Sequence, residues 1–384
     1  MNIESNGVRI HVRNTGDGNA ALVFLHYWGG SSRTWRHVID ALPDRHRTVA
    51  YDHRGWGESE APVDGYAIGD LADDAQNVIA SLGLEHYVIV GHSMGGKVAQ
   101  CIAARGPQGL AGVVLVAPSP PEPMALTDEQ RAQMAGAYDS RESIEFVIDH
   151  VLTAQPLPAE MREQVVADSL RGAPQAKAAW PNAAMREDIS TVVKAIDVPV
   201  LVISGEHDRV DSPDTLRKAL LPHIAQAHME VLPGIGHLSP LEAPAALASL
   251  IEAFVEKIDA GETTPASVPK AFDAALNAGD LERVLSLFTD DATMRMTDGE
   301  VVAANRDALR ERFRGLLSMK PHIRNIVRRT IASGDIALVL MDWSLTLTLP
   351  DGGQATETGT ATQVMQRQES GAWRLRISNP LGVA

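Results

Sequence analysis

The 384-residue sequence has one cysteine and no long apolar run. Cys101 alone cannot form an intrachain disulfide or a thiolate metal cluster, which fits a reducing compartment. The longest apolar runs, Val113–Ala117 and Ile336–Met341, are strand-sized, whereas a membrane-spanning helix needs roughly 18 apolar residues. Residues 1–6 lack the basic and apolar regions of a signal peptide. We therefore expect a cytoplasmic protein that does not cross or bind a membrane.

The sequence also has fewer basic than acidic side chains. The chain has 34 lysine and arginine residues against 49 aspartate and glutamate residues, for a formal net charge of −15. Residues 265–384 contain 14 basic and 14 acidic side chains, so residues 1–264, with 20 and 35, carry the whole net charge. An acidic surface repels phosphate backbones, and we expect no nucleic-acid partner.

Residues 1–258 alternate short apolar strands with helical segments. The core strands are continuous apolar runs, typical of parallel strands covered on both faces. This pattern predicts the α/β fold class, with a doubly wound and mostly parallel sheet. The expected strands are Val8–Val12, Ala21–His26, Arg47–Tyr51, His86–Val90, Gly112–Ala117, Pro199–Ser204 and His228–Leu232, and the expected helices are Ser31–Leu42, Ile68–Leu82, Met94–Ala104, Asp214–Leu221 and Leu241–Ile258.

The alternation is interrupted at residues 118–198. This segment begins with a proline-rich cluster and then shows helical patterns at Asp128–Ala135, Arg141–Leu152, Ala159–Leu170 and Gln175–Ala184. A helical insertion after a sheet strand is expected to cover the carboxyl edge of the sheet as a cap. The alternative is a separate helical domain with no role at the site. The strand pattern resumes directly afterwards, which favours a cap.

Residues 259–269 are rich in helix breakers and are expected to form a linker. The pattern changes in residues 270–384, where helices precede long strands. This order is typical of a separate, smaller α+β domain. The expected helices are Ala271–Leu287 and Arg306–Leu317, and the expected strands are Ala292–Met296, Ile323–Ala332, Ile336–Thr348, Ala355–Gln368 and Trp373–Ser378.

The strongest motif is Gly-His-Ser-Met-Gly-Gly at residues 91–96, between an expected strand and an expected helix. A nucleophile above a sheet needs a very tight strand-to-helix turn, and Gly91 and Gly95 remove side chains that would collide there. The turn exposes the Ser93 hydroxyl and directs the positive end of the helix towards a developing anion. Ser93 is therefore the candidate nucleophile.

A serine hydroxyl needs a base, and the base needs an acid that selects its tautomer. His237 follows the strand His228–Leu232 and supplies the base. Asp208 follows the strand Pro199–Ser204 and is the natural acid, although Asp211 could replace it. The order of serine, aspartate and histidine along the chain is the order used by this strand–turn–helix arrangement.

The transition state also needs oxyanion donors. One should be the backbone N–H of Met94, and the other should come from the loop after Ala21–His26, which reads His-Tyr-Trp-Gly-Gly. Tyr27 and His92, next to these groups, are candidate substrate-binding residues. Histidines and carboxylates show no metal-ligand spacing, so we expect no metal and no cofactor.

Residues 1–258 resemble the α/β-hydrolase fold. The resemblance rests on the elbow at Ser93, on His26–Gly30, on Tyr51–Ser59, on Gly205–Asp208 and on Gly236-His237. It is strongest to serine esterases and cofactor-free haloperoxidases. It implies that Ser93, Asp208 and His237 are the triad and that Trp28 and Met94 are the oxyanion donors. The family commonly has glycine where this chain has Tyr27, so Tyr27 and Trp28 both remain candidates for the second donor.

Residues from about 268 to 384 resemble the SnoaL-like cone fold of the nuclear-transport-factor-like superfamily. The resemblance rests on Ala274–Asp280, Leu287–Ala292 and the ending Trp373–Pro380. It implies a homodimer formed through this domain. Asp342 shares a strand face with Leu338 and Leu340, and this is the face where a cone pocket is expected.

These features predict a serine hydrolase that cleaves a carboxylic ester or lactone through an acyl-enzyme. Two alternatives use the same triad: a cofactor-free perhydrolase or haloperoxidase, and a carbon–carbon bond hydrolase. A third alternative is a non-catalytic ligand-binding module.

Overall fold

The computed structural model describes residues 1–18, 21–124, 126–259, 264–295, 301–303, 306–348, 353–368 and 371–382. The chain divides into two compact units, Met1–Val255 and Glu256–Ala384. Part of the expected linker, residues 260–263, lies outside the described residues, as does Met296 of an expected strand. No helix of the described residues is long and apolar enough to span a membrane.

The first unit contains an eight-stranded sheet in the order β1-β2-β4-β3-β5-β6-β7-β8. β1 and β2 form an antiparallel pair, β2 joins β4 antiparallel, and all later pairings are parallel. The strands are β1 (Asn2–Ser5), β2 (Val8–Thr15), β3 (Ala21–Leu25), β4 (Arg47–Tyr51), β5 (Tyr87–His92), β6 (Leu110–Val116), β7 (Val200–Gly205) and β8 (Ala227–Leu232).

Helices cover both faces of this sheet, which accounts for its apolar strands. Every residue of β3, β5 and β7 is buried, as the continuous apolar runs predict. The helices are α1 (Arg36–Ala41), α2 (Ile68–Ser81), α3 (Met94–Ala104), α8 (Pro213–Ala219), α9 (Ser239–Glu242) and α10 (Pro244–Asp259). The doubly wound α/β fold predicted from the sequence is therefore confirmed.

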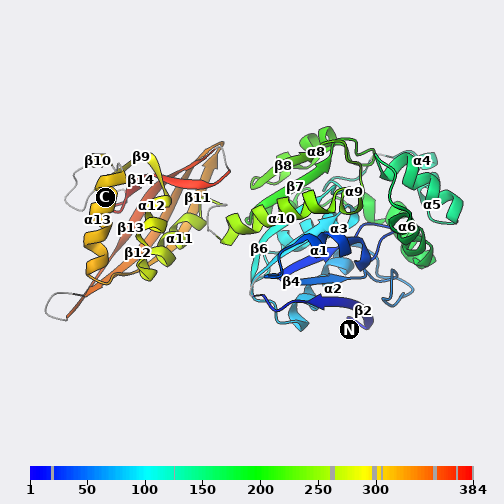
Figure 1. Ribbon diagram of the computed structural model, residues 1–384, viewed down its shortest axis with the longest axis horizontal. Coiled ribbons are helices and arrows are strands. Elements are labelled where there is room, and N and C mark those ends of the chain that lie inside the picture. Colours follow the sequence, from blue (N-terminus) through cyan, green and yellow to red (C-terminus); the bar gives the residue numbers. More distant parts are fainter. Residues whose placement is uncertain are drawn as a thin grey trace. The chain divides into compact units, whose positions relative to one another are not determined.

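The segment between β6 and β7 contains helices joined by loops and, within its described residues, no strand. It contains α4 (Asp128–Ala135), α5 (Arg141–Val147), a π-helical turn (Ile148–Leu152), α6 (Ala159–Arg171) and α7 (Pro174–Asn182). In Figure 1, α4, α5 and α6 gather together at one end of the first unit. Trp28, in the loop after β3, is bound to this segment: its indole Nε1 donates to the Lys177 carbonyl at 3.2 Å.

The second unit is an α+β fold built on a six-stranded sheet in the order β10-β9-β14-β13-β12-β11. Its long strands are antiparallel, while β14 and β9 are parallel. The elements are α11 (Ser267–Ala278), α12 (Leu281–Ser286), β9 (Phe288–Arg295), β10 (Val301–Ala303), α13 (Arg306–Ser318), β11 (His322–Ser333), β12 (Ile336–Thr348), β13 (Gln354–Arg367) and β14 (Trp373–Asn379).

Two sequence expectations need correction here. The single helix expected over 271–287 is two helices, because Gly279 adopts a left-handed φ of 75° that ends α11. Asp280 then caps α12 by accepting a hydrogen bond from the backbone N–H of Arg283 at 3.0 Å. The edge strand β1 was not expected, since four residues with polar flanks carry little periodic signal.

Candidate active site

The turn between β5 and α3 has the geometry that its glycines predict. Ser93 has φ 53° and ψ −113°, a strained conformation for a residue with a side chain. A Cβ on Gly95 would lie 2.6 Å from the Leu25 carbonyl oxygen, so only glycine allows the helix to approach β3 this closely. The Ser93 backbone is held by Val116 and Ser119 at the end of β6, through hydrogen bonds of 3.0 and 3.1 Å.

His237 and Asp208 form a buried hydrogen-bonded pair. His237 Nδ1 lies 2.8 Å from Asp208 Oδ2, and the two side chains are 1% and 0% exposed. The other carboxylate oxygen of Asp208 accepts the backbone N–H groups of Val210 and Asp211 at 2.8 and 3.1 Å. Because the carboxylate only accepts, Nδ1 carries the proton and Nε2 is left with its lone pair.

The sheet explains why the two residues meet. Asp208 follows β7 and His237 follows β8, and these are neighbouring parallel strands whose carboxyl ends share one edge. Their loops are joined directly, by the His207 N–H to the Ile235 carbonyl at 2.8 Å and the Gly234 N–H to Glu206 Oε2 at 2.8 Å.

Electrostatics favour a basic His237. Burial by itself would lower the pKa of His237, but the charge of Asp208 and the hydrogen bond to it raise that pKa above the ordinary value of imidazole. The Asp208 carboxylate thus stabilises the imidazolium that forms when the ring accepts a proton.

Two residues that the sequence did not assign to this role hold the His237 loop. Glu242, on α9, accepts the backbone N–H of Gly236 at 3.0 Å and that of Ala154 at 2.7 Å. It therefore ties the loop to the helical insertion. The Leu238 N–H donates to the Leu152 carbonyl of the same insertion at 2.9 Å.

His92 differs from its expected position. It is fully buried and is not among the residues that line the cavity beside Ser93. Its Nε2 donates to the His237 carbonyl at 2.9 Å, and its ring lies 5.1 Å from Tyr27 and 5.2 Å from His237 between ring centroids. His92, the last residue of β5, thus supports the His237 loop through this hydrogen bond.

A cavity of about 850 Å³ opens beside Ser93 and His237. Tyr27 and Trp28 also line it. The remaining wall comes largely from apolar side chains of the helical insertion, which the sequence could not assign to the cavity: Met124, Leu126, Met134, Phe146, Val147, Val151, Leu152 and Trp180.

The candidate oxyanion donors lie next to this cavity. Among the described residues, no hydrogen bond uses the backbone N–H of Met94, Trp28 or Tyr27. The rest of Trp28 is engaged: its carbonyl accepts the Tyr138 hydroxyl at 2.9 Å, and the two rings lie 4.3 Å apart between centroids. Trp28 therefore also packs against the helical insertion.

Asp211 is a second buried carboxyl at the cavity. It is 2% exposed, and its Oδ2 has no hydrogen-bond partner among the described residues. Burial raises the pKa of Asp211 to about 7; the Asp208 charge adds to this rise, while His237 and Lys97 oppose it. Asp208, and not Asp211, makes the hydrogen bond to the imidazole. Asp211 instead keeps its proton in the acidic range and is about half protonated near pH 7.

Comparisons with known proteins match each unit to a family. A family model for the alpha/beta hydrolase fold matches residues 20–144, and a model for a SnoaL-like domain matches residues 269–375. The AB hydrolase superfamily protein YisY of Bacillus subtilis is 30% identical over 258 residues, which are 64% of this chain and 95% of that protein. The chain belongs to the α/β-hydrolase family.

Two further relatives match a similar share of the chain. A non-heme haloperoxidase of Rhodococcus erythropolis is 29% identical over 251 residues, 61% of this chain and 90% of the relative. The crystal structure of an enol-lactonase from Burkholderia xenovorans is 25% identical with a TM-score of 0.59, covering 67% of this chain and all of that one. The chain is thus an enzyme of the hydrolase class, followed by a SnoaL-like domain.

Asp211 predicts a dependence of stability on pH. Below about pH 4 the carboxyl is protonated in both folded and unfolded chains. Between pH 4 and 7 the unfolded chain loses this proton while the folded chain keeps it, so the free energy of unfolding falls as pH rises. Asp211→Asn removes the loss, and we expect the variant to gain stability over the wild type by a few kcal/mol between pH 5 and 8, at roughly 1.4 kcal/mol per pKa unit.

Urea unfolding at several pH values measures this difference. Asp214→Asn, which removes an exposed carboxylate three residues further on, is the matched control and should show no such trend. If the difference in free energy of unfolding between the wild type and Asp211→Asn stays constant across the range, the raised pKa of Asp211 is contradicted.

Proposed function

We propose that this enzyme is a serine hydrolase that cleaves a carboxylic ester or lactone, with Ser93 as nucleophile, His237 as base and Asp208 as orienting acid. The observation that carries the proposal is the buried His237–Asp208 hydrogen bond at the cavity that Ser93 also lines. The names of relatives, an enol-lactonase among them, favour the same substrate class.

The chemistry follows from the protonation state of His237. Its free Nε2 takes the proton from Ser93 Oγ as that oxygen attacks the substrate carbonyl. The backbone N–H groups of Met94 and of Trp28 or Tyr27 stabilise the oxyanion, each typically contributing about 3–4 kcal/mol in the transition state. His237 then protonates the leaving alcohol, and water activated by the same ring releases the acid from Ser93.

The cavity indicates the kind of group that the substrate carries. Its wall near the helical insertion is apolar, and Phe146 and Trp180 belong to it. Burying an apolar acyl or alcohol group against such a wall is favourable, at roughly 25 cal/mol per Å². We therefore infer that medium-sized apolar esters and lactones bind better than short or highly charged ones.

A perhydrolase is the second candidate, favoured by the haloperoxidase name of a relative. In that reaction hydrogen peroxide, in place of water, attacks the acyl group on Ser93 and the products are a peracid and free enzyme. The ratio of acid to peracid formed with peroxide present separates the two functions.

Ser93→Ala is expected to reduce hydrolysis of p-nitrophenyl esters by at least about a thousand-fold, because the nucleophilic oxygen is lost while the fold is kept. Ser239→Ala is the matched control. Ser239 is also buried, and its hydroxyl has no hydrogen-bond partner in the described part of the chain. Full turnover in purified Ser93→Ala would exclude the proposed mechanism.

The pH dependence of kcat/KM tests the base. A base must be unprotonated to act, so kcat/KM should rise with pH through an inflection above about 6.5, the ordinary pKa of histidine. In Asp208→Asn, burial becomes the main influence on the pKa of His237 and lowers it, so the inflection should move to lower pH. The same substitution should lower kcat by roughly 10³–10⁴. Asp214→Asn should leave both unchanged. An inflection that does not move in Asp208→Asn would argue against the Asp208–His237 pair.

We also propose a homodimer through the SnoaL-like domain. The outer face of its sheet carries exposed isoleucines: Ile326, Ile331, Ile336 and Ile377 are 51%, 53%, 44% and 41% exposed. The strand register places these side chains on one face, because Ile326 pairs with Asp342 and Ile331 with Leu338. An apolar face of this kind is typical of a protein interface.

Sedimentation of the full chain tests the dimer. We expect the wild type to sediment as a dimer and the double variant Ile326→Lys with Ile331→Lys as a monomer, since two lysines cannot be buried at the interface without a large cost. Val63→Lys changes an apolar residue that is 90% exposed in the other unit and should remain dimeric. A monomeric wild type refutes the proposal.

A further inference from the structure

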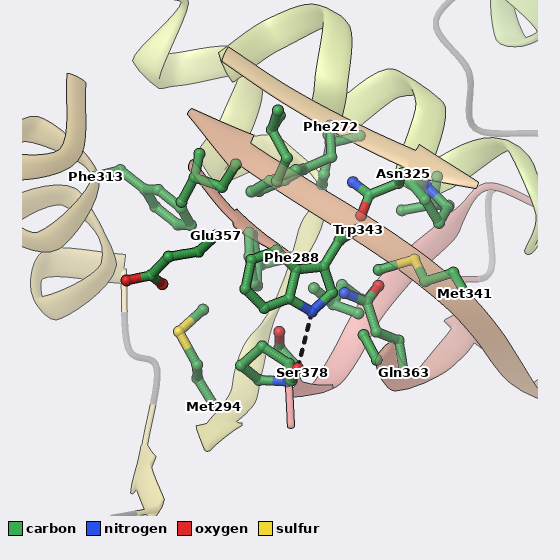
Figure 2. Close-up of a pocket in the computed structure, with 18 residues that line it drawn as sticks. Phe272, Phe288, Met294, Phe313, Asn325, Met341, Trp343, Glu357, Gln363 and Ser378 are labelled. Atoms are coloured by element: carbon green, nitrogen blue, oxygen red, sulfur yellow. Dashed lines mark hydrogen bonds between the residues drawn. The ribbon is translucent and has the colours of Figure 1, made fainter. Parts of the chain in front are cut away.

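The SnoaL-like domain contains a cavity of its own. It lies on the inner face of the sheet, under α11 and α13, and has a volume of about 190 Å³ (Figure 2). A single water needs roughly 10–15 Å³ of such space, so the cavity has room for an organic molecule of one or two rings. Asp342 does not reach it, because the lining residues of β12 are Met341, Trp343 and Leu345 on the opposite strand face.

The wall of this cavity is rich in aromatic side chains. Phe272, Phe288 and Phe313 form a cluster with ring centroids 6.2, 5.7 and 5.6 Å apart. Trp343 donates its indole N–H to the Pro380 carbonyl at 2.9 Å, the dashed line in Figure 2. Because this bond occupies the indole N–H of Trp343, a ligand in the cavity would contact the apolar ring of the tryptophan. Such a wall favours a flat aromatic guest.

One buried acceptor in the wall has no donor. The backbone N–H of Asn325 donates to Asp273 Oδ2 at 2.7 Å, and its side-chain Nδ2 donates to Asp273 Oδ1. These two bonds fix the orientation of the amide. Asn325 Oδ1 is then buried without a hydrogen-bond partner among the described residues. A buried acceptor of this kind is costly unless a donor reaches it, so the cavity suits a ligand with an N–H or O–H group.

The charge at the cavity selects against anions. Glu357 is exposed and lies at the cavity between Phe313 and Met294 in Figure 2. Among the described lining residues it is the one with a formal charge. A carboxylate at the rim repels an anionic ligand and accepts hydrogen bonds from a neutral one.

We propose that this cavity is a binding site for an uncharged aromatic molecule of one or two fused rings that carries an N–H or O–H donor, such as an indole or a phenol. The aromatic wall binds the ring, and Asn325 Oδ1 accepts the hydrogen bond. The site is independent of Ser93 chemistry, so binding and ester hydrolysis can fail separately.

Calorimetric titration of the full chain with indole tests the proposal. Indene has the same ring shape without the N–H, and indole-3-acetate adds a negative charge; we expect both to bind at least about tenfold more weakly than indole. Absence of indole binding up to its solubility limit overturns the proposal. Equal affinity for indene and indole overturns the role of Asn325 and with it the ligand class.

Variants on one strand locate the bound molecule. Leu345→Trp fills the cavity and should abolish indole binding, while Ser344→Trp adds the same ring on the opposite strand face and should leave it unchanged. If Leu345→Trp does not fold, as judged by circular dichroism, Ala361→Leu fills the same space from β13. Indole binding that survives in a folded, filled variant lies elsewhere and refutes the site.

Discussion

The strand-to-helix turn at Ser93 is the constraint on which the proposed active site depends. A serine with a left-handed φ is unfavourable by itself, and it persists because the chain around it leaves no alternative. Gly95 allows α3 to pack against the end of β3, and the backbone of Ser93 is bonded to the end of β6. The turn therefore lies at the centre of the sheet and directs the hydroxyl to the cavity under the helical insertion.

The parallel sheet also positions Asp208 and His237, the other two residues of the proposed triad. β7 and β8 are neighbouring parallel strands that end at the same edge of the sheet, so the loops that follow them meet. Asp208 and His237 therefore come together, although both are more than 100 residues from Ser93 in the sequence. Hydrogen bonds within and between the two loops fix the imidazole. Glu242 extends this network to the helical insertion, so the position of the His237 loop is tied to the element that forms the wall of the cavity.

The two faces of the sheet in the SnoaL-like domain differ in what they carry. Alternation along β12 sends Met341 and Trp343 inward to a cavity and sends Leu338, Leu340 and Asp342 outward. A β-bulge between Val327 and Arg329 keeps Ile326 and Ile331 on the same outer face despite their odd separation. The inner face borders the cavity proposed to bind a small ring, and the outer face carries the exposed isoleucines of the proposed dimer interface.

Several features were readable from the sequence because they depend on local chemistry. Continuous apolar runs predicted buried parallel strands, and glycines around Ser93 predicted a turn that no other residue type permits. The order of Ser93, Asp208 and His237 needed only the strand pattern. Residue type and periodicity did not predict two features. His92 bonds to the His237 loop and does not line the cavity, and Gly279 ends a helix that periodicity alone would extend.

The tertiary structure alone decided the rest, since cavities and unpaired atoms arise from contacts between distant segments. Asp208 and Asp211 are three residues apart and chemically identical. Asp208 reaches His237, whereas Oδ2 of Asp211 is buried without a hydrogen-bond partner among the described residues, because the loop after β7 turns only one carboxylate towards the imidazole. The face of β12 that borders a cavity was likewise set by where α11 and α13 pack, which strand alternation cannot indicate.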